Sequence, residues 1–286
     1  MRPITPLTTD TLEAIDASLN YKVQRTDVAV AIRDDLHHIA FEESAWLASL
    51  RSIPTRRFRG AEFSAEVKSS MIWLYENAFG KRAAEFLREE ILALGLRGCP
   101  YCHMSNAPTL DHMYPKATHP RLAVTPRNLV PCCRDCNDER GKRANSIDLD
   151  PYADTWAETE TWMTATVVDT ADPALLRYSV SPPSAWSKRQ ASRVTDLFTN
   201  AQFASRFRIA ASQEMYGRAE DLLGVFNSGG LDALQASLSR ELQVANTKSR
   251  NHWAAVAYAA WIDSIPHIDW AAALYSYIPN TSSSCI

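Results

Sequence analysis

The 286-residue chain lacks any apolar run of the roughly 20 residues that a membrane-spanning helix requires. We therefore expect no transmembrane helix and no membrane partner. The first ten residues, MRPITPLTTD, also lack the basic segment followed by an apolar one that marks a secretory signal. Together these absences favour a protein of the cytoplasm over a membrane or secreted protein.

The chain also has no overall basic charge, because its net charge is −3, and this balance does not point to nucleic acid. Local charge differs from the average. Between Arg97 and Arg143 there are eight Lys or Arg against four Asp or Glu, and residues 51–60, RSIPTRRFRG, form a second basic cluster. Either cluster is a solvated surface or a phosphate-binding face, and a metal site beside it would favour the second interpretation.

Cysteine is sparse and unevenly placed, with five of the six residues inside 99–136 and only Cys285 remote. This clustering, in a chain without a signal, argues against a disulfide framework and favours metal ligands. Two C-x-x-C pairs, Cys99 with Cys102 and Cys133 with Cys136, suit a tetrahedral zinc ion with no open position. Cys132 lacks this spacing, and we expect it to be a packed thiol.

The pattern of apolar residues divides the chain into three regions: 1–96, 97–150 and 151–286. The first is helical in pattern. The third begins with two strand-like segments, 161–169 and 175–181, which could pair as a hairpin, and continues with helical stripes. The sequence NSGG at 227–230 predicts a turn between two helices.

The middle region, 97–150, has six prolines between Pro100 and Pro131 and no long periodicity. Such a segment would hardly fold by apolar burial alone, because the conformational entropy of ordering it is large. Zinc bound at both ends would clamp the residues between the cysteine pairs and supply the missing folding energy.

The clamped segment contains the sequence LDHMYPK, in which Asp111 precedes His112. An aspartate offers the hard oxygen that Mg²⁺ prefers, and a histidine can take a proton from water near neutral pH. The two side chains would point apart on a regular strand, so a strand end or a bulge is needed to bring both to one site. Asn137 follows the last cysteine, and its amide oxygen is a further candidate metal ligand.

The order CPYC, LDHMYP, NLVPCCRDCN resembles the HNH endonuclease family in its four-cysteine ββα-metal form, over about 50 residues. The resemblance implies a mainly α protein with a small α+β insert, a zinc module between two helical regions. It assigns metal binding to Asp111 and Asn137 and the general base to His112. Asn128 becomes the asparagine that braces the hairpin, and Mg²⁺ or Mn²⁺ the catalytic ion beside the structural Zn²⁺.

A weaker resemblance links the chain to HNH proteins of bacterial anti-phage systems, the Septu-like and retron-associated nucleases that work beside an ATPase. DNA and an ATPase are thus the partners that the resemblance implies. The side chains expected to contact the DNA backbone are Arg127, Arg134, Arg140, Lys142, Arg56 and Arg57.

Two other classes of protein remain open. One is a zinc-binding module that recognises nucleic acid or protein without cutting, which would need the four cysteines but neither His112 nor Asn137. The other is an interaction subunit whose nuclease is silent until it is triggered. Substrate sequence, strand preference and oligomeric state have no signal in the sequence.

Overall fold

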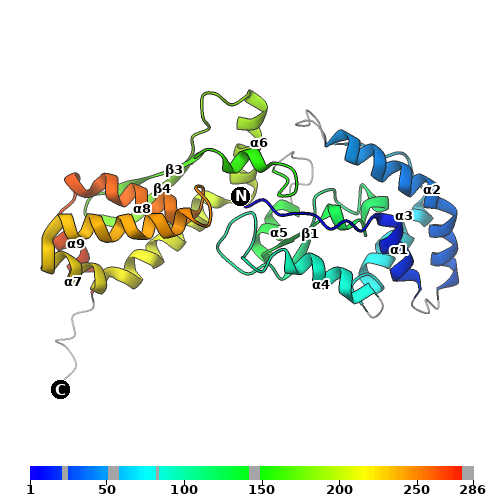
Figure 1. Ribbon diagram of the computed structural model, residues 1–286, viewed down its shortest axis with the longest axis horizontal. Coiled ribbons are helices and arrows are strands. Elements are labelled where there is room, and N and C mark those ends of the chain that lie inside the picture. The colour runs from blue at the N-terminus through cyan, green and yellow to red at the C-terminus, as the bar shows by residue number, and fades with distance from the viewer. Residues whose placement is uncertain (21–24, 51–57, 82–83, 142–148, 279–286) are drawn as a thin grey trace, which may run out of the picture. The chain divides into compact units, whose positions relative to one another are not determined.

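The computed structural model describes residues 1–20, 25–50, 58–81, 84–141 and 149–278 (Figure 1). The chain forms two compact units. The N-terminal unit comprises Arg2–Thr155 and Lys188–Ala201, and the C-terminal unit comprises Met1, Trp156–Ser187 and Gln202–Ile286. Helices predominate in the described ranges, beside two small antiparallel sheets. The predicted mainly α fold with a small α+β insert is therefore confirmed.

The N-terminal unit begins with four helices: α1 (Thr11–Leu19), α2 (Thr26–Ser49), α3 (Ala65–Asn77) and α4 (Glu85–Ala93). Side chains fix where two of them start. Asp10 and Glu13 form a capping box at α1, in which each carboxylate accepts a hydrogen bond from the other residue's backbone N–H. Ser64 caps α3 by accepting from the backbone N–H of Val67.

The ββα order predicted for the middle region follows these helices (Figure 1). Strands β1 (Thr109–His112) and β2 (Leu129–Cys132) are antiparallel, with His112 opposite Leu129. Two short helices, η2 (Pro120–Leu122) and η3 (Pro126–Asn128), lie in the loop between the strands. Helix α5 (Arg134–Gly141) comes next and packs against β1.

The helices and the ββα segment share one hydrophobic core. Apolar stripes of the helices, such as Ile32 and Met71, are fully buried there, and four side chains of the ββα segment join them. These four are Leu110, Ala123, Val124 and Leu129. Helix α6 (Lys188–Asn200) completes the unit, where Arg193 forms a buried ion pair with Asp154.

The C-terminal unit, which the chain enters through η4 (Thr155–Glu158), opens with a β-hairpin of β3 (Met163–Asp169) and β4 (Asp172–Val180), as predicted. Its helices are α7 (Phe203–Asn246), α8 (Trp253–Ser264), η5 (Ile265–His267) and α9 (Trp270–Ser276). Helix α7 is interrupted at Gly229 and Gly230, which confirms the predicted turn. Gly230 has φ 65° and ψ −153°, a conformation essentially restricted to glycine.

None of the helices in the described ranges combines the length and the apolar character that crossing a membrane requires.

Candidate metal centre and active site

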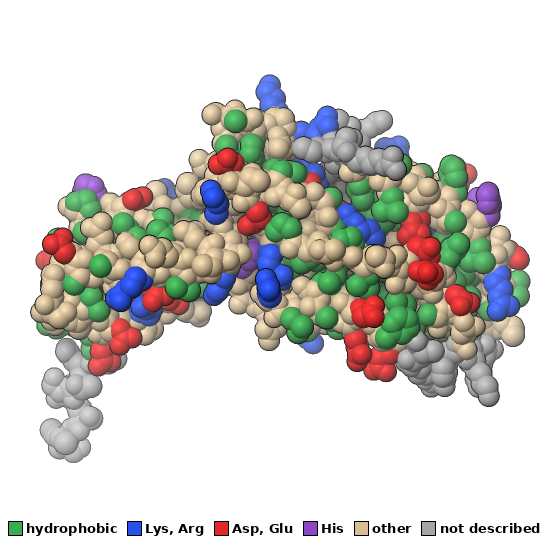
Figure 2. Space-filling model, in the orientation of Figure 1, with side chains coloured by type: hydrophobic (Ala, Val, Ile, Leu, Met, Phe, Trp, Pro, Cys, Tyr) green, Lys and Arg blue, Asp and Glu red, His purple; other side chains and the backbone are tan. Residues whose placement is uncertain are grey.

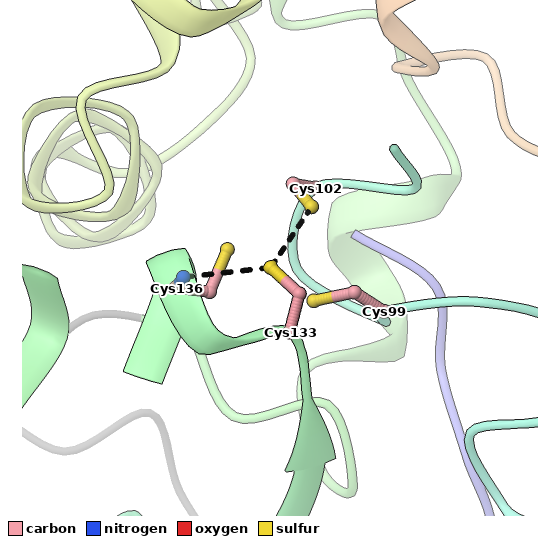
Figure 3. A group of neighbouring side chains, drawn as sticks. All are labelled: Cys99, Cys102, Cys133 and Cys136. Atoms are coloured by element: carbon pink, nitrogen blue, oxygen red, sulfur yellow. Dashed lines mark hydrogen bonds between the residues drawn. The ribbon is translucent and has the colours of Figure 1, made fainter. Parts of the chain in front are cut away.

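Four buried cysteines converge between the loop before β1 and the start of α5 (Figure 3). The ligand atoms of Cys99, Cys102, Cys133 and Cys136 all lie within 4.8 Å of one another. The sulfurs of Cys102 and Cys133 are 3.7 Å apart. A tetrahedral zinc ion with Zn–S bonds of about 2.3 Å separates its sulfurs by about 3.8 Å, so this set could hold zinc.

The backbone around these cysteines is arranged for thiolate ligands. The N–H of Cys136 donates to Cys133 Sγ at 3.4 Å, and that of Met104 to Cys102 Sγ at 3.5 Å. Hydrogen bonds from neighbouring thiols, that of Cys102 first, lower the pKa of Cys133. Arg2 contacts the loop that carries Cys99 and Cys102, since its Nη2 donates to the carbonyl of Gly98 at 2.8 Å.

The fifth cysteine of the cluster, Cys132, is buried but stands apart from the four. Its Sγ lies 3.5 Å from Thr109 Oγ1, and burial raises the pKa of its thiol to about 12. It is therefore a neutral packed thiol, whereas Cys285 lies outside the described residues.

Asp111 and His112 end strand β1 and have different neighbours. Asp111 is buried, where its Oδ2 accepts from the hydroxyl of Tyr101 at 3.2 Å and forms an ion pair with Arg140 of α5. The ring of His112 instead approaches the loop between the strands. Its Nε2 lies 2.8 Å from the carbonyl oxygen of Ala123.

The Ala123 contact fixes the protonation of His112. A carbonyl oxygen can only accept, so Nε2 carries the proton and Nδ1 keeps its lone pair. Burial lowers the pKa of His112 to about 4, a change that the Ala123 bond opposes and that the charge of Lys116 adds to. The imidazole is therefore neutral at pH 7 and able to accept a proton at Nδ1.

Two residues of α3, outside the ββα segment, complete the surroundings of His112. The ring of Tyr75 meets the imidazole edge to face, with centroids 4.5 Å apart. Lys116 Nζ lies 4.8 Å from the centre of the Tyr75 ring and 2.7 Å from Glu76 Oε1. Sequence reasoning did not identify Tyr75, because no motif or spacing in the sequence connects helix α3 with His112.

The two candidate asparagines differ in how many hydrogen bonds their side-chain amides form within the protein. Asn128 is fully buried and satisfied at both ends: its Oδ1 accepts from Tyr114 N–H, and its Nδ2 donates to the carbonyls of Tyr114 and Leu122. It braces the loop and has no oxygen left for a metal. Asn137 is half-buried and donates from Nδ2 to Leu110 at 3.4 Å, and its Oδ1 has no partner among the described residues.

The expected DNA-contacting side chains fall into three groups. Arg134 is exposed on α5. Arg127 instead pairs with Asp150 at 2.8 Å, and its guanidinium lies 4.6 Å from the ring of Tyr152. Arg140 is buried against Asp111. The remaining three, Arg56, Arg57 and Lys142, lie outside the described residues.

Charge of both signs is interspersed over the face drawn in Figure 2. This distribution agrees with the nearly balanced composition of 30 Lys or Arg against 33 Asp or Glu.

Comparison with known proteins identifies the class of the ββα segment. Residues 99–143 match the family model of the HNH endonucleases, so the chain contains an HNH endonuclease domain. Protein ea31 of Escherichia phage lambda is 27% identical over 211 residues, which are 67% of this chain and 71% of that protein. Septu protein PtuB of Bacillus thuringiensis is 30% identical over 77 residues, 24% of this chain and 30% of that protein. No solved structure matches the chain.

Proposed function

We propose that the protein is a metal-dependent endonuclease that hydrolyses DNA phosphodiester bonds, with His112 as the general base. The observation that carries the proposal is the hydrogen bond between His112 Nε2 and Ala123 inside an HNH domain, which leaves Nδ1 as the acceptor. The four cysteines account for a structural zinc without drawing on His112.

The residues divide the chemistry as follows. His112 takes a proton from water at Nδ1 while Nε2–H stays bonded to Ala123. The resulting hydroxide adds to phosphorus as the bond to the 3′ oxygen breaks, and that oxygen takes a proton from solvent. The products carry 5′-phosphate and 3′-hydroxyl ends. A Mg²⁺ or Mn²⁺ ion held by Asp111 and Asn137 would stabilise the negative charge that develops on the phosphate and the leaving oxygen.

The test replaces His112 with alanine and measures cleavage of supercoiled plasmid in Mg²⁺ and in Mn²⁺. Loss of a general base typically lowers the rate by a factor on the order of 10² to 10⁴. The matched control is His37→Ala, because His37 is an exposed histidine of α2. Zinc content and melting temperature should be unchanged in both variants, and cleavage by His112→Ala within a few-fold of wild type would make His112 a bystander.

We extend the proposal to a role as nuclease effector of a bacterial anti-phage system that works with a partner ATPase. The similarity of part of the chain to a Septu protein supports this extension. Its test is the genomic neighbourhood: an adjacent ATPase gene supports the defence role, whereas an adjacent DNA methyltransferase gene would indicate restriction instead.

A second candidate function is a zinc module that binds nucleic acid or protein without cutting. The observation that favours it is the pairing of Asp111 with Arg140, which engages one oxygen of the expected metal ligand. Duplex binding without any cleavage in Mg²⁺ or Mn²⁺ would select this function.

A further inference from the structure

Arg140 is a buried cation that pairs with Asp111, one of the candidate metal ligands. It has 8% of its surface exposed, although it lies on the last turn of a short helix. Its guanidinium pairs with Asp111, lies 4.0 Å from the centre of the Tyr101 ring and places Nη2 3.7 Å from Met113 Sδ. A guanidinium held by a carboxylate, a ring face and a sulfur has a defined position.

This arrangement divides the Asp111 carboxylate between two tasks. Oδ2 receives the Tyr101 hydroxyl and the Arg140 guanidinium. Oδ1 has no hydrogen-bond partner among the described residues, so it is the oxygen that remains for a metal. Asn137 donates from Nδ2 to the carbonyl of Leu110, and its Oδ1, which has no partner among the described residues, likewise remains for a metal. The donor set thus fits a divalent ion, with one oxygen from each residue.

The charge of the set does not fit a divalent ion that binds alone. Asp111 contributes −1, Asn137 contributes nothing, and Arg140 contributes +1, so the three side chains sum to zero. Hard divalent ions are normally bound with the help of carboxylate charge, and a cation within a few ångströms repels them. A phosphodiester brings one negative charge, which is the charge that the site lacks.

We propose that Arg140 couples metal binding to nucleic-acid binding, so that the catalytic ion binds tightly only together with a substrate phosphate. This inference rests on the proposed function of the same site. The coupling is reciprocal: if a duplex tightens metal binding by some factor, the metal tightens duplex binding by that same factor. In the absence of DNA, the metal would then bind weakly and the site would be largely unoccupied.

The experiment measures Mn²⁺ affinity by electron paramagnetic resonance, with and without a 20-base-pair duplex, in a His112→Ala background chosen to slow cleavage during the measurement. We expect the duplex to tighten Mn²⁺ binding at least tenfold. Equal Mn²⁺ affinity with and without the duplex overturns the proposal, and this comparison requires no change at Arg140.

Two further substitutions separate charge from structure. Arg140→Gln removes the charge, so we expect Mn²⁺ to bind about tenfold or more tightly without DNA and the coupling to shrink. Arg140→Lys keeps the charge and should behave as wild type. Zinc content and melting temperature report whether each variant folds. If Arg140→Gln folds and binds Mn²⁺ no more tightly than wild type, Arg140 does not set the coupling.

Failure of this inference is distinguishable from failure of the proposed function. Protein that cleaves DNA but binds Mn²⁺ independently of the duplex contradicts only the coupling. Protein that binds Mn²⁺ and duplex cooperatively but never cleaves contradicts only the proposed reaction.

Discussion

Replacing Arg121 with methionine removes a buried guanidinium that ties the HNH domain to helix α2. Arg121 lies in η2, two residues before the Ala123 carbonyl that contacts His112. Its Nε and Nη2 donate to the two oxygens of Asp35 at 2.6 and 3.0 Å, and its Nη1 donates to Glu42 Oε2 at 3.2 Å. Both acids belong to α2.

The size of the effect follows from burial. Arg121, Asp35 and Glu42 expose 3%, 7% and 2% of their surfaces. Removing one partner of a buried pair leaves an uncompensated charge and costs about 3–5 kcal/mol. Burial already raises the pKa of Glu42, so this acid can take up a proton and limit the loss. We therefore expect Arg121→Met to lower the stability of the N-terminal unit by about 4 kcal/mol.

Native-state hydrogen exchange is the suitable assay, because it reports the free energy of opening for the N-terminal unit separately from the C-terminal unit. The control is Arg25→Met, since the pair between Arg25 and Asp27 is exposed and should contribute little. If Arg121→Met costs no more than Arg25→Met, the buried pairs do not stabilise the unit and the reasoning from burial is wrong.

Two other predictions concern the metal and pH. Elemental analysis should find one zinc per chain, and Cys136→Ser should lose it and unfold the HNH domain, whereas Cys132→Ser should retain it. Burial lowers the pKa of His252 from 6.5 to about 4, and its Nδ1 accepts from the N–H of Ala254 at the start of α8. Between pH 6.5 and 4, His252 binds a proton in the unfolded chain but not in the folded chain. The contribution of the neutral His252 to folding stability is therefore fully present above pH 6.5, and it is lost between pH 6.5 and 4 by on the order of 3 kcal/mol. Hydrogen exchange at pH 7 and 4.5 should show this loss in the C-terminal unit of wild type and a smaller one in His252→Asn, which keeps a side chain able to cap the helix.

Features with local causes could be predicted from the sequence. The two C-x-x-C pairs could be recognised from their spacing alone, whereas the ββα order between them was expected from the resemblance to the HNH endonucleases. The hairpin of β3 and β4 joins residues close in the chain, and Gly229 and Gly230 mark a break wherever they occur. The cysteine pairs, the hairpin and the helix break each depend on neighbours within a few residues or on one tight turn.

Features with distant partners could not be predicted in this way. Arg121 and Asp35 are 86 residues apart in the chain, and no local pattern joins them. Arg127 and Arg140 were expected on a phosphate-binding face because the sequence reveals charge but not the acid that pairs with it. Tyr75 reaches His112 through the packing of α3 on the HNH domain, which only the folded chain brings about.

The common core of helices α1–α4 and the HNH domain has a consequence for how such a domain is inherited. Residues 99–143 alone would expose Leu110, Ala123, Val124 and Leu129 to water, and Arg121 would lose its partners on α2. We therefore expect that this segment does not fold as an independent domain. Transfer of its chemistry to another protein would require the helical framework as well, and exchange by recombination would succeed only at boundaries outside both.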